Sequence, residues 1–319
     1  MRTHNHLEIK QKCESVIPRL FEKNSLGPVE SIQVDKEGWV NPCFFVDGRY
    51  AVRFNARDPN LPKFQRENRV FDLLRESKVP VPPKVILDDS KEVIEYDVLI
   101  SSLLEGENLE ANWKNISPES QIKIAFHAGQ LLRQIHDVSF DFFGEITRQG
   151  PLPQTDNWFS YLNSKLEFHL GEADPFDLFS DEIKNKIWSV FEAYTQELNK
   201  VKSSRLIHVD FHFGNLLFLD DEVSGVLDFE WSFAGDPLYD VSRWLGNEEI
   251  CNGSHIPFLE GYGFSGLNES ESSRIKVYQM IKNIELCPVA KEHFGEDEVK
   301  EYLDITIKQI DSLFDDIKK

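Results

Sequence analysis

The stretch LIHVDFHFGNLLFLDDEVSGVLDFEW, residues 206–231, carries the strongest signal in this sequence of 319 residues. It opens with an apolar run and continues with an aspartate, Asp210, that stands two positions after His208 and five before Asn215. Apolar residues then flank a turn, and Asp228 follows 13 positions after Asn215. Apolar runs on either side of a turn predict two short strands. The polar residues therefore stand at the ends of the predicted strands.

Asp210, Asn215 and Asp228 are the residue types that phosphoryl transfer to a hydroxyl group requires. Such a reaction needs one carboxylate that orients the acceptor hydroxyl, and further oxygen ligands for Mg²⁺. The three residues follow the order of the catalytic loop and the metal-binding segment of kinases. The same pattern fits a polar loop and hairpin in which aspartate and asparagine only cap chain ends. The predicted strands around it favour the chemical interpretation over this alternative.

Composition narrows the classes of function. Lysine and arginine number 35 against 55 aspartates and glutamates, so the net charge is −20, which argues against nucleic acid or an anionic membrane as the main partner. The N-terminus is polar and lacks the apolar core of a signal peptide, and no apolar run approaches the roughly 18–20 residues of a membrane span. The four scattered cysteines do not suggest a zinc site or a disulfide framework. We expect a cytoplasmic protein, and the sequence leaves monomer or dimer open.

The first third of the chain predicts a small lobe rich in strands, residues 1–105. Residues 29–56 alternate as strands do, and Asp47-Gly48 between two apolar runs is a hairpin signal. Residues 63–77 have helical spacing and stop at the prolines of VPVPP. Residues 93–104 return to a strand pattern before the Glu105-Gly106 turn. We therefore place the boundary between the two lobes after residue 105.

The remainder, residues 106–319, predicts a larger helical lobe around the stretch 206–231. Helical periodicity is seen in residues 122–136, 182–198, 274–286 and 299–319. In the first of these helices the expected apolar face consists of Ile122, Ala125, Phe126, Leu132 and Ile135.

Two short patterns suggest other functions and lack the context those functions need. The glycines of Gly261–Gly266 match the dinucleotide-binding pattern GxGxxG, but no strand–helix–strand unit follows in the helical remainder of the chain. His208 and His212 are four residues apart, as in zinc proteases, but they stand in a predicted strand and loop. We expect neither a dinucleotide site nor a zinc site.

The segments IHVDFHFGNLLF and GVLDFEWSFAGDPLYDVSRW resemble the aminoglycoside phosphotransferase family, whose relatives include choline kinase and, more distantly, protein kinases. The resemblance extends from about residue 29 to about residue 290. The hygromycin B phosphotransferases are nearest, through RYAVRFN, the VPVPP turn and FFGEI. The resemblance implies a bilobal α+β fold like that of protein kinases, with a β-rich N-terminal lobe and a mainly helical C-terminal lobe.

By this resemblance Asp210 is the catalytic base and Asn215 and Asp228 hold Mg²⁺. The resemblance also makes His208 structural, and it has Asp236 and Asp240 brace the catalytic loop. For Asp240, capping of a helix is an equally good interpretation.

The resemblance further assigns ATP or GTP to the small lobe. Arg53 stands where the family has a lysine that holds the phosphates, and it is expected to pair with Glu67; a plain surface ion pair is the alternative. Residues 36–41, which end at Asn41, form the expected phosphate loop, and a simple hairpin turn fits them equally well. Ser102 and Leu104 are expected to meet the adenine through their backbone.

The acceptor is the least determined part of the prediction. Glu230 and Trp231 follow the metal-binding aspartate and are the expected substrate residues. The net charge favours a cationic hydroxylated acceptor, with aminoglycoside-type antibiotics as the first candidate. Relatives that act on choline, homoserine, methylthioribose or macrolides offer alternatives. The absence of the usual lysine and of a glycine-rich loop also leaves a nucleotide-binding pseudokinase open.

Overall fold

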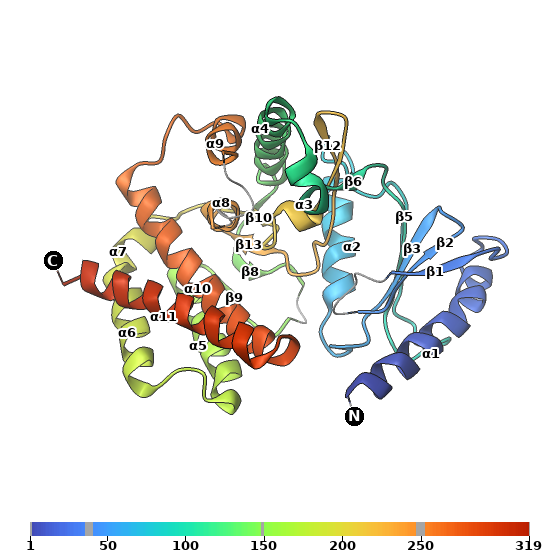
Figure 1. Ribbon diagram of the computed structural model, residues 1–319, viewed down its shortest axis with the longest axis horizontal. Coiled ribbons are helices and arrows are strands. Elements are labelled where there is room, and N and C mark those ends of the chain that lie inside the picture. The colour runs from blue at the N-terminus through green and yellow to red at the C-terminus, as the bar shows by residue number, and fades with distance from the viewer. Residues whose placement is uncertain (1, 36–40, 148–149, 247–252, 319) are drawn as a thin grey trace. The chain divides into compact units, whose positions relative to one another are not determined.

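The computed structural model describes residues 2–35, 41–147, 150–246 and 253–318 (Figure 1). The chain forms two compact units. Unit 1 comprises Met1–Ser120, Ile146–Pro151 and Phe213–Ser232, and unit 2 comprises Gln121–Glu145, Leu152–His212 and Phe233–Lys319. The stretch 206–231 is therefore divided between the two units, after His212. The boundary that the sequence predicts after residue 105 stays a prediction.

Unit 1 is built on an antiparallel sheet with the strand order β1-β2-β3-β5-β4. Asp47, Gly48 and Arg49 connect β2 and β3, and the first two have positive φ, 54° and 61°. The N–H of Arg49 donates to the carbonyl of Val46 at 3.0 Å, so Asp47 and Gly48 are the two central residues of the turn, and the predicted turn is confirmed. The strands are β1 (Ile32–Val34), β2 (Cys43–Val46), β3 (Tyr50–Phe54), β4 (Val85–Asp88) and β5 (Val98–Ser102).

The first helix, α1 (Arg2–Lys23), was not anticipated from the sequence. It runs alongside this sheet in Figure 1. Cys13, Ile17, Leu20 and Phe21 are buried in one cluster with the apolar residues of β2, β3 and β5. Their spacing is that of one helix face, so the periodicity was present in the sequence.

The helix predicted from residue 63 is α2 (Lys63–Leu74), which ends before the proline-rich turn. The strand pattern of residues 93–104 is only partly realised, because β5 begins at Val98. A second, three-stranded sheet of unit 1 pairs β11 with both β12 and β6. Its strands and the short helices nearby are β6 (Glu107–Asn108), α3 (Leu109–Asn112), η1 (Trp113–Asn115), η3 (Phe213–Asn215), β11 (Leu216–Leu219) and β12 (Glu222–Val226).

Unit 2 contains another antiparallel sheet, with the order β7-β10-β13-β8-β9. The strand β10, second in this order, pairs with β13 and β7 and ends just before His208, so it places the loop that carries Asp210. The strands are β7 (Ser139–Phe140), β8 (Phe143–Glu145), β9 (Gln154–Thr155), β10 (Ser204–Ile207) and β13 (Phe233–Gly235).

Helices make up most of unit 2. Among the described residues, no helix is both long enough and apolar enough to span a membrane. The predicted helix at 182–198 is interrupted at Tyr194 and forms α6 and α7. The helices are α4 (Pro118–Ile135), α5 (Trp158–Ala173), η2 (Asp174–Phe176), α6 (Asp181–Ala193), α7 (Thr195–Leu198), α8 (Leu238–Leu245), α9 (His255–Tyr262), α10 (Glu269–His293) and α11 (Glu296–Asp316).

The predicted apolar face of α4 was partly wrong. Ile122, which is 54% exposed, and Phe126 face the solvent. The buried face instead consists of Ile124, Ala125, Ala128, Leu131, Leu132 and Ile135. Because several apolar residues occur on adjacent sides of this helix, the sequence period alone did not decide which side packs.

Helices α4 and α9 cross at two glycines, and here the missing side chains are required. A Cβ atom on Gly261 would lie 1.9 Å from the carbonyl oxygen of Phe126, and one on Gly129 would lie 2.1 Å from that of Phe258. Both obstacles are backbone atoms, which cannot rotate away as a flexible side chain would. The first glycine of the GxGxxG pattern thus serves helix packing.

We expect Gly261→Ala to lower the free energy of unfolding by about 2 kcal/mol or more, because the two helices must separate to admit the methyl group. Urea unfolding of the purified protein measures the effect. Gly171→Ala on α5 is the matched control, since a Cβ there meets nothing within 4 Å. The control is expected to be neutral or stabilising by roughly 0.5–1 kcal/mol, as alanine favours a helix over glycine. Equal stabilities of the two variants would contradict the tight crossing.

Candidate active site

In unit 1 the predicted pair of Arg53 and Glu67 is present. Strand alternation turns Arg53 of β3 away from the α1 side, and α2 presents Glu67 to it. The Nη1 atom of Arg53 donates to both carboxylate oxygens of Glu67 at 2.8 Å. Glu67 is buried, so this is more than a surface pair. An arginine can therefore take the position that the resemblance gives to a lysine.

The other arm of the same guanidinium binds the segment after β12. The Nη2 atom of Arg53 donates to Asp228 Oδ1 at 3.3 Å and to Glu230 Oε2 at 3.0 Å. Burial alone lowers the pKa of Arg53, but the charges of Glu67, Asp228 and Glu230 outweigh burial and raise that pKa. Arg53 thus stays charged and joins α2 to the hairpin segment.

Glu230 is held inside unit 1 by further cations. Lys63 Nζ lies 3.4 Å from Glu230 Oε1 and 2.7 Å from Asp58 Oδ2, and Arg66 donates to the backbone oxygen of Glu230 at 2.6 Å. Lys63 also lies 4.2 Å from the ring centre of Trp231. The carboxylate of Glu230, a predicted substrate residue, thus contacts Arg53 and Lys63 of its own unit. No role for Lys63 or Arg66 was predicted from the sequence. Lys63 stands three residues before Arg66 and four before Glu67, spacings that place it on the same side of the predicted helix as both.

The hairpin of β11 and β12 brings Asn215 and Asp228 together at its open end. Leu216 pairs with Val226, and the backbone N–H of Leu227 donates to the carbonyl of Asn215 at 2.9 Å. Asp228 has a φ of 66°, in the left-handed region that aspartate tolerates better than most residues. Oxygen atoms of Glu67, Asp228 and Glu230 lie within 4.8 Å of one another, and the guanidinium of Arg53 binds all three carboxylates.

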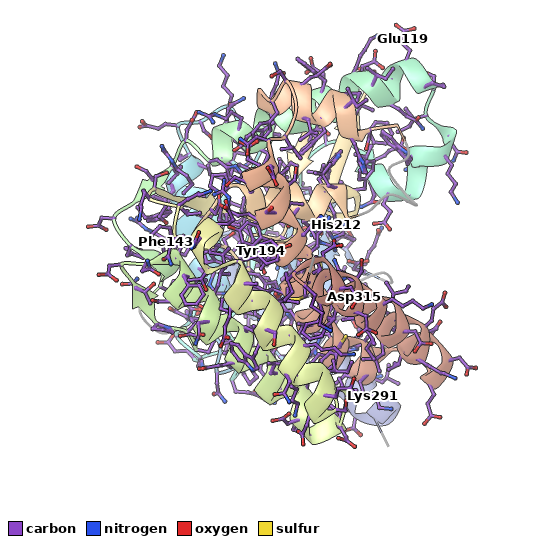
Figure 2. All side chains as sticks on the ribbon, turned by 90° about the vertical axis from the view of Figure 1, so that its left-hand side faces the viewer. Glu119, Phe143, Tyr194, His212, Lys291 and Asp315 are labelled. Carbon is purple, nitrogen blue, oxygen red and sulfur yellow. The ribbon has the colours of Figure 1, made fainter. Side chains whose placement is uncertain are left out.

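In unit 2 basic side chains bind Asp210. Arg243 Nε donates to Asp210 Oδ1 at 3.1 Å, and Nε2 of His212, labelled in Figure 2, lies 3.3 Å from Oδ2. Burial raises the pKa of Asp210, but the hydrogen bond from His212 and the charges of Lys282, His212 and Arg243 hold it well below its usual value. Asp210 is therefore a carboxylate at neutral pH and accepts hydrogen bonds only.

Asp240 of α8 fixes the backbone that leads into Asp210. Its two carboxylate oxygens accept from the N–H groups of His208 and Val209, both at 2.7 Å, and His136 Nε2 lies 3.0 Å from one of them. Val209 has a φ of 78°, which is costly for a β-branched residue. The expected brace by Asp240 is therefore present, and His208 is fully buried, as expected of a structural residue.

The bonds of Asp236 differ from that expectation. Its carboxylate accepts from Tyr278 at 2.7 Å and from Arg274 at 2.8 Å, both on α10. The side chain also accepts from the N–H of Leu238 at the start of α8. Asp236 therefore ties α10 to the start of α8.

The other predicted nucleotide residues are spread over unit 1. The Asn41 side chain accepts from the N–H of Arg57 at 3.3 Å, while residues 36–40 of the expected phosphate loop lie outside the described residues. Ser102 and Leu104 line a hollow of about 620 Å³ beside the β2–β3 turn. The Ser102 hydroxyl accepts from the N–H of Lys84 at 3.1 Å. The residues that line this hollow are Gly48, Arg49, Tyr50, Lys84, Ser102, Leu103, Leu104, Glu105 and Gly106.

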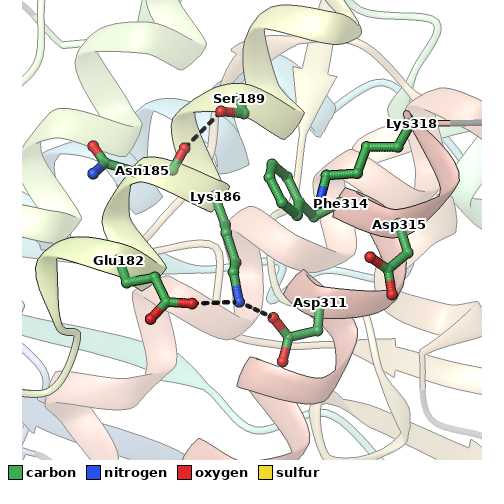
Figure 3. A pocket seen from close by; sticks show the side chains of 8 residues that line it. All are labelled: Glu182, Asn185, Lys186, Ser189, Asp311, Phe314, Asp315 and Lys318. Atoms are coloured by element: carbon green, nitrogen blue, oxygen red, sulfur yellow. Dashed lines mark hydrogen bonds and ion pairs between the residues drawn. The ribbon is translucent and has the colours of Figure 1, made fainter.

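A second hollow, of about 570 Å³, lies between α6 and α11 of unit 2. Figure 3 shows Lys186 between Glu182 and Asp311, with distances of 3.0 Å and 2.8 Å from its Nζ atom. The described residues that line this hollow include none of the predicted site residues. Lys186 is therefore a lysine whose charge is already matched by carboxylates.

Comparison with known proteins identifies relatives that match most of this chain. Residues 31–275 match the family model named APH, the phosphotransferase enzyme family. Acyl-CoA dehydrogenase family member 10 of Mus musculus is 26% identical over 245 residues, which are 72% of this chain and 21% of that protein. The chain thus spans about a fifth of the length of this curated relative.

Solved structures of aminoglycoside phosphotransferases share the fold. The gentamicin complex of APH(2″)-IIa has a TM-score of 0.69 at 17% identity and covers 92% of this chain and 95% of that chain. The ternary complex of a thermostable APH(4)-Ia mutant with AMP-PNP and hygromycin B has a TM-score of 0.68 at 16% identity, with 93% and 97% covered. ADP-bound APH(2″)-Ib reaches 0.66 at 15% identity, with 94% and 98% covered.

These likenesses confirm the predicted α+β fold of the protein-kinase type. The family match extends over most of the chain, from β1 to the first part of α10. It includes Arg53, Glu67, Asp210, Asn215 and Asp228. The chain belongs to the APH phosphotransferase enzyme family.

Proposed function

We propose that this protein transfers the γ-phosphoryl group of ATP or GTP to a hydroxyl group of a small molecule. The observation that carries the proposal is the Arg53 guanidinium, which binds Glu67 on α2 with one arm and Asp228 after β12 with the other. A fixed guanidinium beside an accessible carboxylate provides a partner for phosphate oxygens and a ligand for their metal ion. Membership of the family and the ADP and AMP-PNP in the solved neighbours support a nucleotide donor.

On the nucleotide side, Asn215 and Asp228 would hold Mg²⁺. Their amide and carboxylate oxygens are suitable ligands, they stand together at the open end of one hairpin, and Asp228 is partly exposed. Bound Mg²⁺ would neutralise charge on the β- and γ-phosphates. Arg53 would bind phosphate oxygens with the arm that now contacts Asp228, while Glu67 keeps its orientation.

On the acceptor side, Asp210 would accept a hydrogen bond from the reacting hydroxyl group and then take its proton. Its lowered pKa keeps it ionised and ready to accept. Arg243 and His212 fix the position of the carboxylate, and Asp240 fixes the backbone before it. These contacts favour positioning of the hydroxyl as the larger contribution of this residue.

Several kinds of small hydroxylated molecule are candidates for the acceptor. The aminoglycosides bound by the solved neighbours are one candidate, and choline-, homoserine-, methylthioribose- or macrolide-type acceptors are others. The prediction of a cationic acceptor rests on the net charge of −20. The basic side chains around Asp210 favour an acceptor of the opposite charge.

Turnover of nucleotide tests the proposal directly. The purified chain is incubated with ATP or GTP, with and without Mg²⁺, in the presence of a panel of hydroxylated compounds, and transfer of labelled γ-phosphate is measured. Metal-dependent transfer to a hydroxyl group is expected. Nucleotide binding without transfer to any compound would favour the non-catalytic pseudokinase instead.

Replacing Arg53 with alanine is expected to raise the Kd for ATP by about 10- to 100-fold, since a charged hydrogen bond contributes roughly 1.5–3 kcal/mol. Arg53→Lys should retain most of the affinity, because the charge remains. Equilibrium binding measures both, and thermal melting verifies that Glu67, left buried without its partner, has not unfolded the alanine variant. An unchanged Kd in Arg53→Ala would refute the phosphate role and leave only a structural ion pair.

A further inference from the structure

Basic side chains gather around Asp210 in unit 2, although the protein as a whole is acidic. Arg243 and His212 bind its carboxylate at 3.1 Å and 3.3 Å. Lys282 of α10 is a third basic residue, and its charge contributes to the low pKa of Asp210. The immediate surroundings of the proposed base are therefore positive.

Lys282 belongs to a buried group that contains more positive than negative charge. Lys282 Nζ and Lys165 Nζ lie 3.4 Å and 3.1 Å from the carboxylate of Glu285. The side chains of Lys165, Lys282 and Glu285 are 7%, 11% and 14% exposed. Two ammonium groups thus share one carboxylate in a place that is largely removed from water. When Arg243 and Asp210 are included, three cations face two carboxylates. Burying a charge is costly unless it is paired, so this arrangement favours a further anion.

The neighbouring histidine does not remove the imbalance. His169 Nε2 lies 3.1 Å from Lys165 Nζ, and its Nδ1 lies 2.8 Å from Glu172. Burial, followed by the charge of Lys165, lowers the pKa of His169, so its ring is neutral at pH 7 and adds no cation. Glu172 is 46% exposed, and water screens its charge from Lys165.

Hydrogen bonds between α8 and α10 flank Lys282, whereas Lys165 lies on α5 and joins Lys282 through Glu285. Gln279 of α10 donates to the carbonyl of Ser242 at 3.3 Å, and the hydroxyl of Tyr239 donates to Glu285 at 3.5 Å. On α10, Lys282 lies one turn after Gln279 and one turn before Glu285, the two residues that contact α8. Arg243, which binds Asp210, follows Ser242 on the facing helix.

We propose that the acceptor carries an anionic group, a carboxylate or a phosphate, which binds Lys165 and Lys282 while its hydroxyl group meets Asp210. This inference rests on the proposed function and names the substrate class of its acceptor side. It opposes the cationic acceptor predicted from the net charge. Local charges take precedence, because interactions within about 4 Å in a buried site are strong, whereas those of distant surface charges are screened within about 8–10 Å.

A panel of acceptors with matched skeletons and different charges tests the inference. Hydroxy acids and phosphorylated alcohols are compared with neutral polyols and with amino alcohols, with gluconate, glucose and glucosamine as one matched set, and with glycerol 3-phosphate and glycerol as another. The best acceptor is expected to be an anion, and the carboxylate and phosphate sets distinguish the two kinds of anionic group. If the best acceptor is neutral or cationic, the inference fails and the proposed function stands. If no compound is phosphorylated, the proposed function itself fails.

Variants of the lysine pair supply a second test. Lys165→Met and Lys282→Met each remove one charge and retain much of the side-chain volume. Each is expected to raise KM for the anionic acceptor at least tenfold, because a charged hydrogen bond is lost, and to leave KM for ATP within about twofold. Lys186→Met on α6 is the matched control, with a lysine paired to Glu182 and Asp311, and should leave both constants unchanged. An unaltered acceptor KM in both lysine variants would overturn the assignment.

Thermal stability without substrate tests the charge imbalance independently of activity. Glu285→Gln leaves two buried lysines without a carboxylate and is expected to lower Tm. Lys282→Met leaves Glu285 paired with Lys165 and is expected to keep or raise Tm. If Lys282→Met lowers Tm as much as Glu285→Gln does, both lysines are needed to balance existing charge, and the inference of a further anion is wrong.

Discussion

Replacing Asp210 with asparagine is expected to lower kcat by about 10²- to 10⁴-fold and to leave the fold and nucleotide affinity nearly intact. The amide keeps the shape of the carboxylate, but it cannot take a proton from the acceptor hydroxyl. The native pKa of Asp210 is well below its usual value despite burial, because His212, Lys282 and Arg243 stabilise the charge. Steady-state kinetics give kcat, and equilibrium binding gives the Kd for ATP.

Asp220→Asn is the matched control for this substitution. Asp220 lies in the exposed turn between β11 and β12 and has a φ of 55°, a conformation that asparagine also adopts. The control should have the kcat of the wild type. If Asp210→Asn also retains a kcat near that of the wild type, Asp210 is not the group that acts on the hydroxyl.

Replacing Asp228 with alanine is expected to lower kcat by about 10²- to 10³-fold, because the Mg²⁺ ion would lose its charged ligand. The positive charge of the metal ion is needed to stabilise the negative charge that develops on the transferred phosphoryl group. Asn215→Ala removes a neutral ligand and should have a smaller effect. Raising the Mg²⁺ concentration should partly restore Asn215→Ala. Titration of activity with Mg²⁺ measures both effects.

Glu222→Ala controls for the loss of a carboxylate from the same hairpin, since Glu222 lies at its closed end and is exposed. Its Mg²⁺ titration should match that of the wild type. Titration curves that are unchanged in both Asn215→Ala and Asp228→Ala would show that neither residue is a metal ligand. The Arg53–Asp228 contact would then have a structural role only.

Local features of the fold were predictable because their causes lie within a few residues. Asp47-Gly48 supports the β2–β3 hairpin since both residues tolerate positive φ. The proline-rich turn ends α2, and the paired strands around the second turn put Asn215 and Asp228 at one hairpin end. The helix α1 had the same kind of local signal, in Cys13, Ile17 and Leu20, but the polar and charged residues between them made it inconspicuous.

The packing of helices was less predictable. Apolar residues stand on more than one side of α4, and only packing within the folded chain decides which side is buried. Asp236 and Asp240 occur in one short turn, but Asp240 binds the catalytic loop and Asp236 binds α10. Their roles depend on which helix lies opposite, and sequence spacing carries no such information.

The order of Asp210, Asn215 and Asp228, and thereby the expectation of phosphoryl transfer, came from the sequence by itself, because these residues are close in the chain and adjoin predicted strands. Only the tertiary structure decided their partners. Arg53 contacts Asp228, which is 175 residues away in the sequence, and Lys165 contacts Glu285, which is 120 residues away. Nothing in the sequence pattern indicated the contacts of Lys63 and Arg243. The net charge is the sum over all charged residues of the chain. A bound substrate interacts mainly with the few charged side chains that packing places beside it, because water and salt screen the more distant ones.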